Sequence, residues 1–364
     1  MKLRLLSFLI LLIATGPASA QTASIDHAHI ATEALRKHIQ PAYHRLTEAF
    51  DDMRKSAVLY CRKPDEARLD DLKDRFAEAV RAWGGIAHIY FGPVRTGNSY
   101  ERIWFWPDRK AIGQRQVLSA LRDKPADYLD AATLGGKSIA VQGLGAFEQV
   151  LYGPLANPVQ DGGGFACNYV VAIAGNLTAV AGEVEAEWRD DGTFAKLWLT
   201  PGPENRAYLS DQEITFVLVR ALMEHLERVR DTELARPLGV TQSRRVLPGP
   251  FSESGLTMTF IASRVAGLQS LLVDTALAEE LEKAAMANGD TETKANIEQA
   301  LFELRLLKRR TAELSEVPDV LGDAPERTQA IALGFPLKSA RRTIANAAGR
   351  LTDLPVGFNA SDGD

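Results

Sequence analysis

Apolar residues recur every three or four positions along most of this chain, and this spacing constrains the fold more than any other feature of the sequence. In the stretch ATEALRKHIQPAYHRLTEAF, one apolar stripe over several helical turns is formed by Leu35, Ile39, Tyr43, Leu46 and Phe50. Runs rich in Ala, Leu, Glu, Arg and Lys follow, while alternating patterns of β-branched residues are scarce. The sequence therefore predicts an all-α fold.

The same periodicity places the helices along the chain. An antiparallel pair is expected first, over residues 31–61 and 65–92, with a kink or a break at Pro41 because proline disrupts a helix interior. The other expected helices cover residues 110–122, 137–152, 163–190, 207–234, 256–275, 277–288, 291–313 and 326–352. Two long interruptions that contain proline and glycine, residues 92–108 and 236–255, separate them.

The length of the chain predicts two packed units. The chain has 364 residues, and beyond about 250–300 residues a single hydrophobic core usually stops growing. We expect an N-terminal helical bundle over residues 21–200, which contains the motif helix described below, and a C-terminal helical bundle over residues 201–364. Each half contains one long interruption, so the two bundles are candidates for an internal duplication.

The first 20 residues have the composition of a secretory signal peptide. Lys2 and Arg4 precede the apolar run 5–14, and ASA ends the segment, which predicts cleavage after Ala20 and export to the bacterial periplasm. No later segment has the roughly 18 uninterrupted apolar residues of a membrane-spanning helix. The net charge is −5 and the sequence has no basic stripe, which argues against nucleic acid as a partner.

Two cysteines bear on the compartment and on the packing. Cys61 and Cys167 are the two cysteines of the chain, and an exported protein meets oxidising conditions. A long-range disulfide between them is one interpretation. Two separate buried thiols are the other, because a sequence does not show the distance between two side chains.

The stretch VQGLGAFEQVLYGP, residues 141–154, combines one carboxylate, Glu148, with two glycines, Gly143 and Gly145. A glycine inside a helix costs about 1 kcal/mol relative to alanine, which indicates close approach of another backbone or of a ligand. The apolar stripe of this expected helix consists of Ala140, Leu144, Phe147 and Leu151. Glu148 lies beside the stripe, so it is either a carboxylate of a functional site or an ordinary carboxylate at the edge of the core.

Four separated stretches resemble one family of exported bacterial proteins. VQGLGAFEQVLYG, YFGPVRTGNSYERIWFWPD, EWRDDG and the C-terminal VGFNASDGD are similar to stretches of the imelysin-like family, also called the M75 peptidase family, and occur in the same order. The resemblance covers about residues 25–364. It implies an all-helical fold of two bundles and an association with iron or haem acquisition, and also with proteolysis for the founding member of the family.

The hallmark of that family is a G-x-H-x-x-E motif on a helix. In this sequence the glycine and the glutamate of the motif fall on Gly143 and Glu148, while Gly145 occupies the histidine position. A histidine three residues before Glu148 would share its helix face and hold a metal with it, whereas Glu148 alone would be a weak metal ligand. The resemblance therefore leaves open whether iron or another divalent metal is a cofactor.

The loop NSYERIWFWPDRK, residues 98–110, is the second candidate for a site. Trp104 and Trp106 carry large apolar surfaces, and Arg102 and Asp108 carry charges that are costly to bury unpaired. In one interpretation the loop is a ligand-facing wall, with Arg102 on an anionic group and the tryptophans stacked on a flat molecule. In the other, the loop plugs the bundle, and Arg102 pairs with a carboxylate such as Asp108.

The histidines offer weaker indications. His29 and Glu33 lie four residues apart, which suits two metal ligands on one helix face, but a solvated face near the start of the mature chain is the plainer interpretation. We expect His88 in the core or anchoring a loop, and His225 on a solvated helix face.

Three functions are compatible with these features. The first is a non-catalytic binding protein in iron or haem uptake, whose partner is a small ligand or an envelope protein. Its expected ligand-binding residues are Arg102, Trp104, Trp106, Asp108, Gly143 and Glu148. The second is a metal-dependent peptidase of the M75 type, with Glu148 as general base or metal ligand, and the third is an envelope scaffold. Glycine in the histidine position of the motif favours the first, because a catalytic metal normally needs about three protein ligands.

Overall fold

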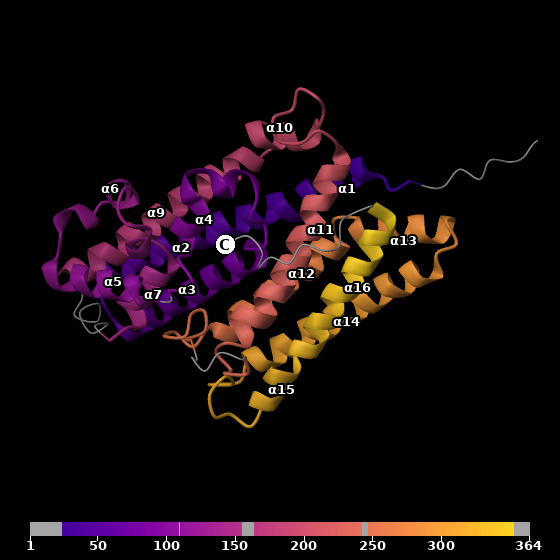
Figure 1. Ribbon diagram of the computed structural model, residues 1–364. Helices are drawn as coiled ribbons and strands as arrows, with labels where there is room; N and C mark the ends of the chain where they lie inside the picture. Colours follow the sequence, from indigo (N-terminus) through magenta and orange to yellow (C-terminus); the bar gives the residue numbers. More distant parts are fainter. Residues whose placement is uncertain (1–23, 109, 155–163, 242–246, 353–364) are drawn as a thin grey trace, which may run out of the picture.

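The computed structural model of the chain describes residues 24–108, 110–154, 164–241 and 247–352 (Figure 1). Within these ranges the regular structure is helical and no strand is formed, which confirms the all-α prediction. The predicted signal peptide with its cleavage site after Ala20 and the C-terminal VGFNASDGD lie outside the described residues.

The α-helices are α1 (His27–Glu33), α2 (Gln40–Arg62), α3 (Glu66–Ile86), α4 (Ser99–Ile103), α5 (Ile112–Asp123), α6 (Ala131–Gly135), α7 (Leu144–Tyr152), α9 (Gly164–Trp188), α10 (Thr193–Leu199), α11 (Asp211–Arg228), α12 (Thr257–Val273), α13 (Leu277–Ala287), α14 (Thr291–Ser315), α15 (Arg327–Ala332) and α16 (Gly334–Thr352). Short 3-10 turns cover Gly92–Asn98, Ala126–Tyr128 and Ile139–Val141. The π-helical turns cover Ala34–Ile39 and Val229–Leu234.

The first half of the chain packs around α2. This helix lies against α3 and against the long helix α9, and α6 and α7 also pack on α9 (Figure 1). The predicted stripe lies in the core. Its members are all fully buried, namely Leu35, Ile39, Tyr43, Leu46 and Phe50. A disulfide joins Cys61, near the end of α2, to Cys167, in the first turn of α9, which confirms the bridged interpretation of the cysteines.

The second half packs around α14. Both α12 and α16 lie along α14, and α11 lies against α16 (Figure 1). Ser210 caps α11 by accepting a hydrogen bond from the backbone N–H of Glu213, and the Glu213 carboxylate accepts one from the N–H of Leu209. This reciprocal cap explains why the helix begins at Asp211 and not at residue 207 as expected.

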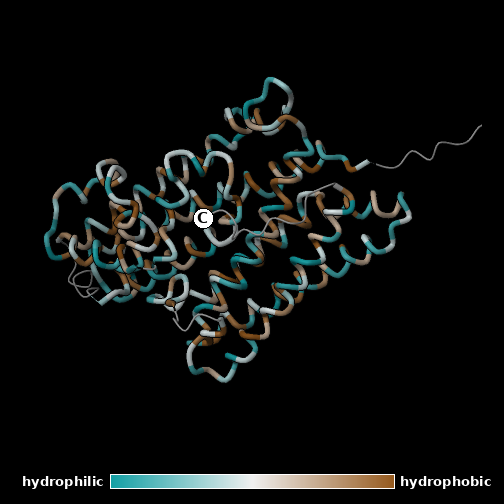
Figure 2. The backbone as a smooth tube through the Cα atoms, viewed as in Figure 1, coloured by the Kyte–Doolittle hydropathy of each residue, from teal (hydrophilic) through white to brown (hydrophobic). Residues whose placement is uncertain are grey.

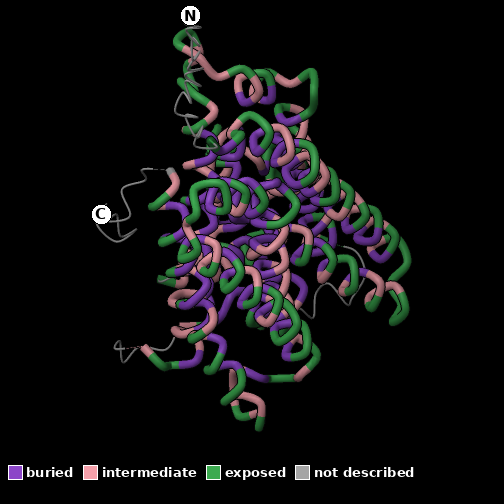
Figure 3. Tube along the Cα trace, turned by 90° about the vertical axis from the view of Figure 1, so that its right-hand side faces the viewer, coloured by how far each residue is buried: buried purple, intermediate pink, exposed green. Residues whose placement is uncertain are grey.

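Helices α3 and α12 join the two halves through a close crossing at glycines. A Cβ atom on Gly267 would lie 2.3 Å from the carbonyl oxygen of Gly85, and one on Gly84 would lie 2.7 Å from the Cβ of Ser263. The crossing therefore requires glycine on both helices. Buried apolar residues form one continuous cluster across both halves, with hydrophobic positions (Figure 2) and buried positions (Figure 3) recurring along each helix. The division at residue 200 and the duplication stay predictions.

Three buried histidines and a buried arginine lie at this junction. His38 Nε2 is 2.7 Å from His88 Nε2, and His38 Nδ1 is 2.9 Å from the hydroxyl of Ser270 on α12. His225 Nδ1 accepts a hydrogen bond from Arg264, whose side chain is fully buried. His88 is in the core as expected. The prediction of a solvated face for His225 is wrong, because α11 packs against α12 and α16 there.

Two of the expected helices differ from the prediction. The helix predicted over 31–61 contains a π-helical turn that ends at Ile39 and leads directly into α2 at Gln40, and the backbone stays helical on both sides, so the helix is not split at Pro41. The prediction of one helix over 137–152 is wrong, because a 3-10 turn ends at Val141 and α7 begins only at Leu144.

Helix α9 has a composition that a membrane helix could also have. With α10 it contains an 18-residue window that is apolar enough to cross a membrane, but 61% of that window is buried inside the protein. Its neighbours are α2, α6 and α7, so its apolar residues serve the core of the first half.

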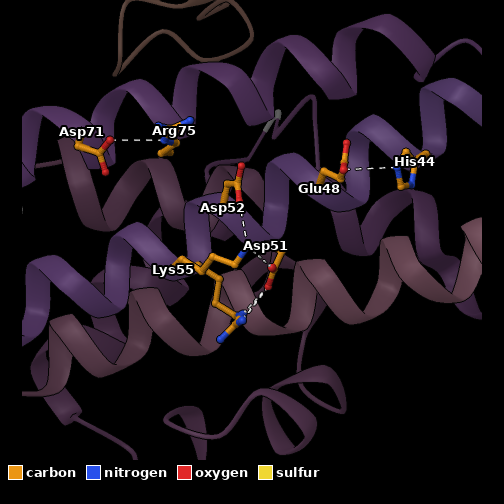
Figure 4. A network of polar contacts seen from close by, with 8 residues as sticks. His44, Glu48, Asp51, Asp52, Lys55, Asp71 and Arg75 are labelled. Atoms are coloured by element: carbon orange, nitrogen blue, oxygen red, sulfur yellow. Dashed lines mark hydrogen bonds and ion pairs between the residues drawn. The ribbon is translucent and has the colours of Figure 1, made fainter.

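Charged side chains occupy the outer faces of α2 and α3. Figure 4 shows three groups of ion pairs there, formed by Lys55 with Asp51 and Asp52, by His44 with Glu48, and by Arg75 with Asp71. Solvated pairs of this kind contribute little to stability. Packing therefore holds α2 against α3, and the disulfide ties α2 to α9.

We expect the double variant Cys61→Ser/Cys167→Ser to unfold more easily than the parent protein. The disulfide links positions 106 residues apart and restricts the unfolded chain, so its loss should lower the free energy of unfolding by about 2–5 kcal/mol. Urea denaturation followed by circular dichroism measures this loss. A reducing agent should bring the parent to the midpoint of the variant, and equal midpoints without reductant would contradict the expectation.

We also expect the stability to fall in mild acid. Burial lowers the pKa of His38 to about 4 and lowers the pKa of His88 and of His225 well below the usual value. Histidine in an unfolded chain titrates near pH 6.5, so the unfolded state binds more protons between about pH 6.5 and pH 4. Stability is therefore fully present above this window and is lost as the pH falls through it, by about 1.4 kcal/mol per pH unit for each histidine.

Thermal denaturation at a series of pH values tests this expectation. The variant His38→Gln should show a flatter loss of stability between pH 6.5 and pH 5 than the parent. His44 is exposed on α2 and has a raised pKa because its ring bonds to Glu185, so His44→Gln should leave the loss in acid as steep as before. An unchanged slope in His38→Gln would refute the assignment.

Candidate functional site

A cavity of about 170 Å³ lies where three segments meet: the residues that follow α4, helix α7, and the loop that precedes α12. We call it the aromatic pocket. Five of the predicted site residues line it, namely Trp104, Trp106, Asp108, Gly143 and Glu148. The loop that precedes α12 adds residues 247–249 and 251–253, so the pocket needs both halves of the chain.

Glu148 is the buried carboxylate of the pocket. It lies on α7 with 6% of its surface exposed, and its Oε1 accepts hydrogen bonds from the backbone N–H of Ser254 at 2.9 Å and from the Ser254 hydroxyl at 2.7 Å. Burial raises the pKa of Glu148 to about 7, although the hydrogen bonds from Ser254 oppose this effect. Glu148 is therefore a buried group of the pocket and not an ordinary carboxylate at the edge of the core.

Gly143 and Gly145 have different surroundings in the structure. Gly143 precedes α7 in an extended conformation, and a Cβ atom there would lie 2.6 Å from the carbonyl oxygen of Arg102 and 2.8 Å from that of Ile103. Gly145 is in the first turn of α7 and lines the pocket, and a Cβ atom there would meet no atom within 4 Å. Close packing thus explains Gly143, whereas Gly145 leaves open space.

Stacked aromatic rings make the wall of the pocket. The rings of Trp104 and Trp106 are 5.0 Å apart and nearly parallel, and Trp104 also stacks at 5.6 Å on Phe251 from the second half. Phe260 on α12 packs against Trp104 at 4.8 Å. Trp104 is buried within this cluster, and Trp106 is partly exposed, so Trp106 is the tryptophan with surface left for a ligand.

Arg102 does not belong to the pocket. Its guanidinium donates hydrogen bonds to the side-chain oxygens of Gln142 at 3.2 Å and of Asn176 at 3.0 Å, and Asn176 also donates to Gln142. The predicted pairing of Arg102 with a carboxylate is therefore wrong, because its partners are neutral amides, while a contact of Arg102 with an anionic ligand stays a prediction outside this pocket. The Arg102 guanidinium therefore holds the start of the loop that carries Trp104 and Trp106 against α9.

Asp108 combines a structural role with a place in the pocket wall. Its two carboxylate oxygens accept hydrogen bonds at 2.7 Å from the backbone N–H groups of Ile112 and Gly113, at the start of α5. A carboxylate at the beginning of a helix also interacts favourably with the helix dipole. Asp108 thus brings an acidic side chain to the wall.

Sequence reasoning missed the second-half contribution to the site. Phe251, Glu253 and Ser254 come from the interruption 236–255, which was recognised only as a break rich in proline and glycine. The one indication of a site in that interruption was the stretch PGPFSESG, where one aromatic and three polar residues follow two prolines. Nothing in that pattern indicates that Ser254 reaches Glu148.

The metal pair considered for His29 and Glu33 stays untested. Glu33 makes an ion pair with Lys37 on the next turn. Within the described ranges, no group of three His, Cys, Asp or Glu side chains is arranged to hold a metal ion.

We expect the two motif glycines to respond oppositely to alanine. Gly145→Ala should raise the free energy of unfolding by about 0.5–1 kcal/mol, because alanine favours the helix and its methyl group meets open space. Gly143→Ala should lower it by about 1–3 kcal/mol, because the methyl group would overlap two carbonyl oxygens. Urea denaturation of both variants measures the difference, and a Gly143→Ala protein as stable as the parent would contradict the packing described above.

Comparison with known proteins agrees with this architecture. A family model described as Imelysin, peptidase M75, matches residues 39–353. An imelysin-like protein from Psychrobacter arcticum 273-4 has a similar structure, with 20% identity and a TM-score of 0.76 over 92% of this chain and 100% of that one. The structure of a "putative iron-regulated protein A precursor" from Parabacteroides distasonis ATCC 8503 is also similar, with 9% identity and a TM-score of 0.67. The likeness covers 90% of this chain and 97% of that one. No curated protein matches the chain. Since the family model spans most of its length, the chain belongs to the imelysin family.

Proposed function

We propose that this protein is an exported, non-catalytic binding protein that acts in iron or haem uptake, with the aromatic pocket as its binding site. Gly145 carries the proposal. Histidine at this position of the motif would place a metal ligand beside Glu148, whereas glycine leaves the position open within 4 Å and lines the pocket. Glycine at this position therefore leaves room for a bound molecule, where histidine would supply a side chain to coordinate a metal ion.

Two further observations support the setting. The signal-peptide composition of residues 1–20 and the disulfide between Cys61 and Cys167 both suit an oxidising, exported compartment. The iron link is supported by the structural likeness to the protein from Parabacteroides distasonis, whose name describes it as iron-regulated.

The side chains of the pocket do not fit a resident metal ion. Both oxygens of Asp108 accept hydrogen bonds from the start of α5, and Oε1 of Glu148 accepts two from Ser254. A catalytic metal site normally has three protein ligands and one open position. In this proposal the protein takes part in iron or haem uptake, but the aromatic pocket does not itself hold a metal ion.

One observation favours a second function, a metal-dependent peptidase of the M75 type. A carboxylate with a pKa of about 7 is suited to act as a general base near neutral pH, and Glu148 lines a cavity that a substrate could reach. The donor set argues against it, because Glu148 lacks the imidazole partner that would complete a metal site on α7.

A genetic test addresses the role of the pocket. In the host bacterium, deletion of the gene should slow growth when an iron chelator limits the supply, and the parent gene should restore growth. Gly145→Trp should fail to restore it although the protein accumulates and unfolds at the parental temperature, because the indole fills the pocket. Gly202→Trp is the matched control, since Gly202 also has open space around its Cβ position but does not line the pocket. Full growth with Gly145→Trp would refute the binding role.

A direct assay separates binding from proteolysis. The purified mature protein should leave an unfolded protein substrate uncut with zinc or iron added, and Glu148→Gln should behave the same way. Metal-dependent cleavage that is lost in Glu148→Gln would establish the peptidase instead.

A further inference from the structure

We propose that the aromatic pocket recognises a positively charged organic group, an ammonium or a guanidinium, rather than a neutral or anionic ligand. The inference rests on the proposed function, since it names the chemistry of the ligand that the pocket would bind. It is carried by the charges that line the cavity, by the stacked rings of its wall and by its size.

The charged side chains that line the pocket are all acidic. Asp108, Glu148 and Glu253 contribute carboxylates from three different segments, and no lysine, arginine or histidine belongs to the lining formed by the described residues. None of the three makes an ion pair with another described residue. A low-dielectric cavity with charges of one sign attracts the opposite charge, and repels its own. An anionic group such as a carboxylate would therefore be disfavoured here.

An acidic lining suits a ligand that donates hydrogen bonds. Gln149 also lines the pocket, but its Oε1 would lie 3.0 Å from a Cβ atom on Gly153, which is not part of the lining. An ammonium or a guanidinium carries several N–H donors and no acceptor, so it matches a site whose charged side chains are carboxylates.

The aromatic wall favours a cation as well. The faces of indole rings carry negative electrostatic potential, and a cation within about 6 Å of a ring centre is attracted to it. Trp106 lines the pocket at the outer end of the stack with Trp104 and is partly exposed. Arg228 approaches the ring of Trp104 at 5.8 Å, but it does not line the pocket and is paired with the buried carboxylate of Glu233.

The size of the cavity limits the ligand to a small group. Its volume of about 170 Å³ is below the roughly 300–1,000 Å³ of pockets that enclose drug-sized molecules. A free amine or guanidine of a few carbon atoms fits this description, and so does one lysine or arginine side chain of a peptide. The two sources share one chemistry and can be separated by experiment.

Cation binding should be coupled to the ionisation of Glu148. Glu148 is a stronger partner for a cation when it is ionised, so affinity should rise as the pH rises through about 7, the pKa to which burial brings this carboxyl. The ionisable groups near it are Glu253 in the loop, Tyr152 on α7, Asp74 on α3 near Tyr152, and Asp108 across the pocket. All of these side chains are acids, which carry no positive charge in either protonation state, so none of them neutralises Glu148.

Calorimetric titration with three probes of one shape tests the charge preference. Benzamidine is a cation, benzamide is neutral and benzoate is an anion, and all three are planar and nearly equal in size. We expect the mature protein at pH 8 to bind benzamidine at least ten-fold more tightly than benzamide, and to bind benzoate not at all. Benzamide or benzoate binding as tightly as benzamidine would overturn the inference.

Variants show whether the carboxylates of the pocket are responsible. Glu148→Gln and Glu253→Gln should each weaken benzamidine binding by at least five-fold, and Glu148→Gln should remove the gain in affinity between pH 6 and pH 8. Glu298→Gln is the matched control, because Glu298 is an exposed carboxylate of α14 outside the pocket. Retention of parental affinity and of the parental pH dependence in Glu148→Gln would refute the assignment.

Two further probes identify the source of the cation and separate this inference from the proposed function. Agmatine stands for a free guanidine and a capped Gly-Arg-Gly peptide for a side chain, and we expect at least one of them to compete with benzamidine. If no cationic probe binds but Gly145→Trp still fails to support growth on limiting iron, the charge inference is wrong and the binding role stands. If cations bind and Gly145→Trp supports full growth, the pocket chemistry is right and the proposed function is wrong.

Discussion

The stack of Trp106, Trp104 and Phe251 is the contact on which the pocket depends. Two of these rings come from the residues after α4 and the third from the loop before α12, so the stack forms only when the two halves of the chain are docked. Such aromatic pairs contribute about 0.5–1.5 kcal/mol each beyond the area that they bury. Because the same rings hold the halves together and line the cavity, a shift of one half against the other would change the shape of the pocket.

Polar groups fix the second half beside the tryptophan loop. Arg264 is fully buried and contacts both His225 and Glu233, while Arg228 connects Glu233 to the carbonyl oxygen of Trp106. All four side chains belong to the second half, and removing one partner of such a buried charge costs about 3–5 kcal/mol. The network therefore holds α11 against α12, and the bond from Arg228 to Trp106 links it to the loop that carries the tryptophans.

The helices could be predicted because their signal is local. Spacing of three and four residues predicted the buried stripe from Leu35 to Phe50, whereas the break expected at Pro41 is a π-helical turn that leads directly into α2. Five of the six residues predicted to bind a ligand line one cavity, and they were chosen from local patterns and from the family resemblance. The partners of Arg102 could not be predicted, because Gln142 and Asn176 are 40 and 74 residues away. Ser254 was not predicted for the same reason, since only tertiary packing brings it to Glu148 across 106 positions.

The difference between Gly143 and Gly145 shows why the loss of one side chain redefines the site. Gly143 holds the backbone of α7 against residues 102–103, so the placement of Glu148 survives whatever follows it. At Gly145 the backbone is free to carry any side chain, and glycine there removes the only imidazole that the motif would supply while keeping the carboxylate buried. A buried carboxylate without a metal or an ion pair is unfavourable when ionised, which is the origin of its raised pKa. On the proposal made above, a cation that enters the pocket relieves this unfavourable energy, and Glu148 is then a selective partner for positive charge.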